Sequence, residues 1–110
     1  MSANSNNDAF NRYLKRFINE HIKTLPTRSF GLIEDYESMF MLMFKGWSLL
    51  KMHPCSSHVK LRKLEPLIEM IDRFDDGIER PIQLSTLRSI EHHPDWKRIQ
   101  NEARQVDMDD

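Results

Sequence analysis

Five side chains of the types that bind metals lie in two short segments of this chain. They are His53, Cys55, His58, His92 and His93. Imidazole nitrogen and cysteine thiolate are the donors that zinc prefers in proteins. As a set, however, these residues do not follow the paired C-x2-4-C and H-x3-5-H arrangement of standard zinc sites. We therefore predict no metal site and no cofactor, while the sequence alone does not tell whether the two segments meet in space.

The single cysteine of the chain, Cys55, is also the only candidate for nucleophilic catalysis. A catalytic thiolate needs a base within hydrogen-bond reach and donors that stabilise an oxyanion. Histidines are close in the sequence, but no glycine-rich turn accompanies them. We therefore expect a protein that is not an enzyme. One cysteine cannot form an intramolecular disulfide, and it suits a reducing compartment.

Acidic side chains recur at helical spacing in the second half of the chain. They are Glu65, Glu69, Asp72 and Asp76. Because successive members are four, three and four residues apart, a helix places them on one continuous ridge. Most ridges of this kind are solvated faces. The alternative is a docking surface, on which complementary charge attracts and orients a basic protein partner.

A second polar face lies near the C-terminus. If residues 85–92 and 94–106 form two consecutive helices, the second helix buries Trp96, Ile99 and Ala103 and turns its polar side chains outward. These polar side chains are Lys97, Arg98, Gln100, Asn101 and Arg104. Arginine, glutamine and asparagine read base edges in the major groove of DNA. A DNA-binding helix-turn-helix is therefore the alternative function, although a solvated face explains the same pattern and a net charge of −1 disfavours general nucleic-acid binding.

Residues 39–44 are six consecutive apolar residues, which leave no polar side on a helix. A helix over residues 29–52 carries one broad apolar stripe on an inward face. The stripe comprises Phe30, Ile33, Tyr36, Met39, Phe40, Met43, Phe44, Trp47 and Leu50. Met41 and Met52 fall on the opposite side, which is otherwise polar. Because methionine suits protein docking, these two either pack in the core or form an exposed patch with nearby leucines.

Glycine and proline divide the chain into helices. Pro26 ends the first amphipathic helix, and Gly77 ends the third. Pro66 lies inside the third helix, where it is expected to kink the helix or to restart it. Gly46, inside the second helix, either lets a neighbouring helix approach or is merely tolerated.

The whole pattern predicts an all-α fold, a compact bundle of four to five helices. We expect residues 1–7 to form a disordered leader, residues 8–106 a single helical domain and residues 107–110 an acidic tail. A chain of 110 residues is long enough for one core only. The predicted helices cover about residues 8–25, 29–52, 57–76, 85–92 and 94–106.

Size and composition favour a binding function. No apolar run approaches the roughly 18 residues of a membrane span, and the first residues lack the features of a signal peptide. We therefore expect a cytoplasmic protein of the inhibitor, immunity, antitoxin or adaptor type from a bacterium or phage, without membrane contact. Its partner is expected to be a protein, and a homodimer stays open as an alternative. The predicted contact residues are Glu65, Glu69, Asp72, Asp76 and Met41.

Overall fold

The computed structural model describes residues 2–54 and 59–106, which contain five α-helices and no strand. The predicted all-α bundle is therefore confirmed. A π-helical turn continues the first helix and a 3-10 turn follows it. The elements are α1 (Ser2–Phe17), the π-helical turn (Ile18–Ile22), the 3-10 turn (Leu25–Thr27), α2 (Ile33–Met52), α3 (Val59–Asp76), α4 (Leu84–Ile90) and α5 (Pro94–Arg104).

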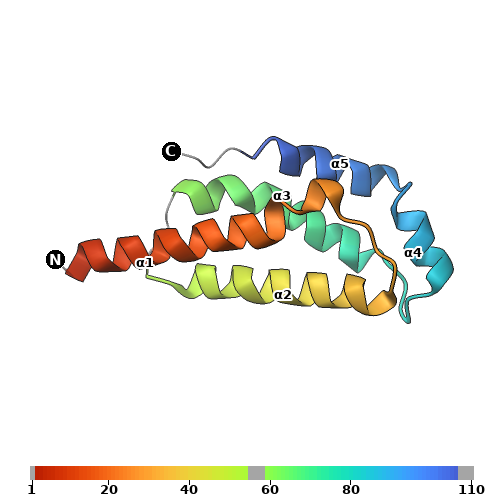
Figure 1. The fold of residues 1–110 in the computed structure, drawn as a ribbon, viewed down its shortest axis with the longest axis horizontal. Helices are drawn as coiled ribbons and strands as arrows, with labels where there is room; N and C mark the ends of the chain where they lie inside the picture. Colours follow the sequence, from red (N-terminus) through yellow and green to blue (C-terminus); the bar gives the residue numbers. More distant parts are fainter. Residues whose placement is uncertain (1, 55–58, 107–110) are drawn as a thin grey trace.

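The molecule is elongated, with principal extents of 53 × 25 × 20 Å. Figure 1 shows α1, α2 and α3 running along the long axis, with α1 antiparallel to α2. In the same view α5 lies along the edge opposite α2, and the short α4 closes the end at which α3 finishes. Within the described part of the chain, no helix combines the length and the apolar character that a bilayer span requires.

Trp96 of α5 lies at the centre of the core and is only 1% exposed. The centroid of its ring system is 5.4 Å from that of Phe30, 6.4 Å from that of Phe40 and 5.5 Å from that of Phe74. These rings come from the segment before α2, from α2 and from α3. The indole therefore holds together parts of the chain that are remote in the sequence.

The inward face of α2 matches the predicted apolar stripe. Its buried members are Tyr36, Met39, Phe40, Met43 and Leu50. Ile33, Phe44 and Trp47 are partly buried against the same core. Because apolar residues three and four apart share one side of a helix, this face was readable from spacing alone.

The start of α1 and the course of α3 differ from the prediction. α1 begins at Ser2 rather than near residue 8, because residues 2–7 contain no glycine or proline that would stop a helix. α3 continues through Pro66 as one helix, so the alternative of a restart is wrong. Pro66 is exposed, which lets water satisfy the carbonyl that loses its amide partner. The predicted tail, residues 107–110, lies outside the described residues.

The start of α2 also differs from the prediction. The helix begins at Ile33 rather than at residue 29, after Leu32 in extended conformation. The backbone is already extended at Arg28, and the side chain of Phe30 turns into the core. Burial of this ring therefore delays the start of the helix to Ile33.

Candidate functional site

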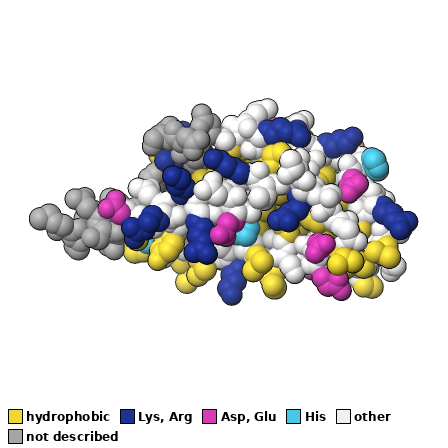
Figure 2. All heavy atoms as spheres, in the orientation of Figure 1, with side chains coloured by type: hydrophobic (Ala, Val, Ile, Leu, Met, Phe, Trp, Pro, Cys, Tyr) yellow, Lys and Arg dark blue, Asp and Glu magenta, His cyan; other side chains and the backbone are white. Residues whose placement is uncertain are grey.

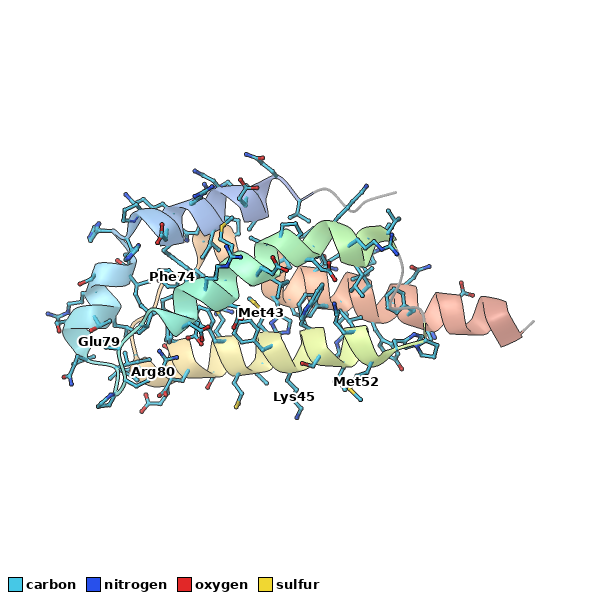
Figure 3. All side chains as sticks on the ribbon, turned by 180° about the vertical axis from the view of Figure 1, so that it is seen from behind. Met43, Lys45, Met52, Phe74, Glu79 and Arg80 are labelled. Atoms are coloured by element: carbon cyan, nitrogen blue, oxygen red, sulfur yellow. The ribbon has the colours of Figure 1, made fainter. Side chains whose placement is uncertain are left out.

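Residues 39–44 divide between the core and the surface. Met43 is fully buried, whereas Met41 is 63% exposed and Leu42 is 51% exposed. Farther along the same helix, Met52 is 80% exposed. Figure 3 shows Met43 inside the bundle and Met52 pointing away from it. Met41 and Met52 therefore lie on the surface of this chain and not in its core.

A largely apolar groove of about 450 Å³ lies between α1 and α2. Phe17, Gly46 and Leu50 line its inner part. Tyr13 and Leu49 also line it and are 58% and 62% exposed, so they form its rims. The remaining lining residues are polar: Arg16, Glu20, His21 and His53.

Gly46 lets α1 and α2 approach each other closely. A Cβ atom at this position would lie 3.1 Å from Cδ2 and 3.3 Å from Cε2 of Phe17, which is closer than ordinary van der Waals contact. The Phe17 ring also packs near Trp47, with ring centroids 6.0 Å apart. Of the two alternatives left open for Gly46, this close contact favours a role in helix packing.

Two histidines line the groove and pack against aromatic rings. His21 is partly buried, and its ring centroid lies 5.1 Å from that of Phe17. Burial lowers the pKa of His21 below its ordinary value, although Glu20 opposes this effect. The ring of His53 lies 5.0 Å from that of Phe10. Because its pKa is lowered, His21 is neutral at pH 7 and adds no charge to the groove.

The charged side chains around the groove are mainly basic. Arg16 and Glu20 line it and form an ion pair at 3.0 Å. Arg12 lies one turn before Arg16 on α1, and Lys45 lies one turn before Leu49 on α2. Among the described residues, neither Arg12 nor Lys45 forms an ion pair. Figure 2 shows dark blue side chains beside yellow ones over α1 and along the edge formed by α2.

The histidines considered as possible metal ligands lie at opposite ends of the molecule. His53 follows α2, whereas His92 and His93 lie between α4 and α5 (Figure 1). His93 instead accepts a hydrogen bond at Nδ1 from a backbone amide in the first turn of α5, at 3.1 Å. Cys55 and His58 lie outside the described residues. In the part of the chain that the structure describes, no three potential ligands are placed to hold a metal.

The four residues of the acidic ridge lie on α3, and one of them has an ion-pair partner. Glu65 accepts a hydrogen bond from Nζ of Lys51 at 2.8 Å. Glu69 and Asp72 line a second groove of about 370 Å³ between α2 and α3, and Asp76 is exposed at the end of α3. Lys51 neutralises one end of the ridge, and a docking role for the ridge stays a prediction.

Asp75, next to the ridge, belongs to an internal network. The Tyr36 hydroxyl donates a hydrogen bond to Asp75 Oδ1 at 3.0 Å, and Arg80 Nη2 donates to the same oxygen at 2.7 Å. Arg80 Nη1 also donates to the carbonyl of Ile78 at 2.8 Å. Burial, together with the neighbouring carboxylate, raises the pKa of Tyr36. The network fastens the segment after α3 to α2.

The polar side chains of α5 divide between solvent and internal contacts. Lys97, Arg98, Asn101 and Arg104 are exposed, and only Gln100 is partly buried. Gln100 Nε2 donates to the carbonyls of Leu25 at 2.9 Å and Pro26 at 3.3 Å. Arg104 donates to Asn101 at 2.8 Å and to the Pro26 carbonyl at 3.4 Å. Two of the five side chains expected to read bases therefore hold α5 against the 3-10 turn.

Tyr13 is the groove residue that the sequence pattern missed. It lies beside the buried stripe of α1, one turn before Phe17, so spacing alone assigns it to neither face. Gly46 on the facing helix could have indicated this position, because large side chains beside a close helix contact lie at its edge.

Comparisons of the chain with protein families, with curated proteins and with solved structures found no match. Function is therefore inferred from the geometry of the described residues.

Proposed function

We propose that this protein is a non-enzymatic binding module that occupies a protein partner, in the manner of an inhibitor, immunity protein, antitoxin or adaptor. It docks through the α1–α2 surface, which comprises the groove between these helices and their exposed apolar side chains. The proposal places the protein in the cytoplasm, because a single cysteine suits a reducing compartment. The exposed apolar side chains of the surface are Tyr13, Met41, Leu42, Leu49 and Met52.

The gathering of exposed apolar side chains on this surface carries the proposal. Among the described residues, five of the eight exposed large hydrophobic side chains belong to it. Single exposed apolar residues are normal on a monomer, whereas their concentration on two adjacent helices favours an interaction site. Methionine adapts its shape to a partner at little cost, so Met41 and Met52 suit this role.

The other two candidate surfaces give less support to a docking function. On the acidic ridge, Glu65 already pairs with Lys51. On α5, Gln100 and Arg104 donate to the backbone of this chain, so fewer side chains are left to read DNA. A basic partner on the ridge and a DNA-binding helix pair therefore rank below the α1–α2 surface.

The proposal is tested by three forms of the protein used as bait in native extract. They are the wild type, the double variant Leu42→Glu/Leu49→Glu and the control Leu84→Glu. Leu84 is a matched control, because it is 54% exposed but lies on α4. We expect the wild type and the control to retain the same partner and the double variant to lose it, with equal helicity in all three by circular dichroism. Equal retention by the double variant would refute the proposal.

A further inference from the structure

We infer that the groove between α1 and α2 binds an amphipathic helix of the partner that carries acidic side chains beside its apolar stripe. This inference rests on the proposed function and adds the shape and charge of the segment that docks. Its two supports are the form of the groove and the charges around it.

The form of the groove suits a helix. It runs between two antiparallel helices (Figure 1), and its inner part is lined by Phe17, Gly46 and Leu50. Its volume of about 450 Å³ is within the usual range of binding pockets. An amphipathic helix that lies in such a groove inserts side chains at positions i, i+3 or i+4, and i+7. The exposed side chains of Tyr13 and Leu49 would then contact the flanks of the bound helix.

The charges around the groove favour acidic flanks on that helix. Glu20 is already paired with Arg16, and one turn from the lining residues lie Arg12 and Lys45, which form no ion pair among the described residues. These two cations outnumber the one carboxylate beside them, that of Asp8, which lies a further turn before Arg12. Figure 3 shows Lys45 pointing away from the bundle, on the outer side of α2. An apolar stripe in the groove would bring the flanking side chains of the bound helix towards these two cations, where carboxylates are favourable and ammonium groups are not.

The same observations disfavour two other occupants. A second copy of this chain docked on the same surface would bring the basic side chains of both copies together. A flat lipid surface would contact the exposed rims of the groove, Tyr13 and Leu49, and leave the space between them unfilled. A helix of another protein can both fill the groove and bring acidic side chains to the basic ones beside it.

The inference is tested with three labelled amphipathic peptides of about 18 residues, roughly 27 Å long when helical. All three carry the same apolar stripe, and their flanks are acidic, uncharged or basic. Fluorescence anisotropy measures affinity for the full chain at about 50 and about 300 mM salt, which span strong and weak screening. Amide chemical shifts show where each peptide binds. We expect the acidic peptide to bind along α1 and α2 about tenfold more tightly than the basic one, because each solvated ion pair adds at most about fivefold.

Matched variants separate apolar contact from charge. Leu49→Glu should weaken binding of the acidic peptide about tenfold or more, since it replaces a rim contact by a like charge, whereas Leu84→Glu should leave it unchanged. Lys45→Glu should weaken the acidic peptide and strengthen the basic one, whereas the same change at the exposed Lys97 should do neither. If Lys45→Glu makes the basic peptide bind more tightly than the acidic one, charge recognition is the cause, because general damage to the fold would weaken the binding of both peptides.

The outcomes distinguish this inference from the proposed function. Tighter binding of the basic peptide, or equal binding of all three at low salt, would overturn the acidic partner and leave a protein-docking groove. Chemical shift changes confined to other helices, or no binding of any peptide, would overturn the groove as a helix site. In either case the proposed function would stand if native partner capture still depended on Leu42 and Leu49. Concentration-dependent dimers in ultracentrifugation that Leu49→Glu abolishes would identify a second copy as the occupant and overturn the inference.

Discussion

Replacing Tyr36 by phenylalanine should destabilise the protein at neutral pH by an amount that disappears in alkaline solution. The variant keeps the fully buried ring and removes only the hydroxyl, which donates to Asp75 Oδ1 at 3.0 Å. Hydrogen bonds to charged groups contribute about 1.5–3 kcal/mol. Arg80 still donates to the same carboxylate oxygen at 2.7 Å, so we expect the lower figure, about 1.5 kcal/mol. For a chain of this length this corresponds to a melting temperature about 6 °C lower.

The pH dependence follows from the raised pKa of Tyr36 in the folded state. An unfolded tyrosine ionises with a pKa of about 10, whereas the folded protein holds Tyr36 neutral to higher pH. The stability that this group contributes is therefore complete below about pH 10 and is lost as the pH rises further. Each pH unit above 10 costs the wild type about 1.4 kcal/mol, a cost that the Tyr36→Phe variant does not have. The two stabilities should therefore become equal near about pH 11.

Urea denaturation followed by circular dichroism, at several pH values between neutral and about 11, measures the difference between wild type and variant. Ionisation of other groups affects both proteins and cancels in this difference. Tyr13→Phe is the matched control, because Tyr13 is 58% exposed, and it should change stability by less than about 0.5 kcal/mol at pH 7. A wild-type advantage that stays constant through pH 11 would refute the reasoning, as would a variant as stable as wild type at pH 7.

Three further predictions concern helix packing, the position of α5 and the groove histidine. Gly46→Leu should lower the free energy of unfolding by about 2 kcal/mol, since the new side chain overfills a helix contact. The control Lys45→Leu, on the outside of α2, should lower it by less than about 0.5 kcal/mol. Equal losses of stability for the two variants in urea denaturation would contradict this prediction. Gln100→Ala should cost about 0.5–1.5 kcal/mol by removing the hydrogen bonds that its side chain donates to the 3-10 turn, and hydrogen exchange should quicken in the 3-10 turn, unlike in Asn101→Ala. Because the pKa of His21 is lowered in the folded state, its stabilising contribution is present above pH ~6.5 and is lost as pH falls through the folded pKa. His21→Gln should therefore show a flatter stability curve than wild type between about pH 7 and pH 5, and parallel curves would exclude this role.

The buried faces of the helices could be predicted because they depend on local spacing. Apolar residues three or four apart meet on one side of a helix whatever packs against it. The same spacing does not specify where a helix starts. α1 extends to Ser2 because nothing in its first residues interrupts it, and α2 starts late because Phe30 is drawn into the core by rings from other helices.

Polar side chains were predicted less well, because their roles depend on contacts between distant segments. Gln100 has the spacing of a solvent-facing residue, but its amide bonds the 3-10 turn 75 residues earlier in the chain. In the sequence, Asp75 resembles a member of the acidic ridge. In the structure, it accepts a hydrogen bond from the buried hydroxyl of Tyr36. The groove likewise exists only where Gly46 meets a phenylalanine from α1. Each of these features requires knowledge of which helices are neighbours.

The fold does not require the apolar character of Met41 and Leu42. Their neighbours on α2 fill the core or pack partly against it, whereas these two are 63% and 51% exposed. At positions this open, a polar residue would change stability by only about 0.5 kcal/mol and would reduce the exposed apolar area. Folding of the monomer thus gives no reason for two large apolar side chains here. Contact with a partner gives one, because the area they expose in the free protein is the area that docking would remove from water.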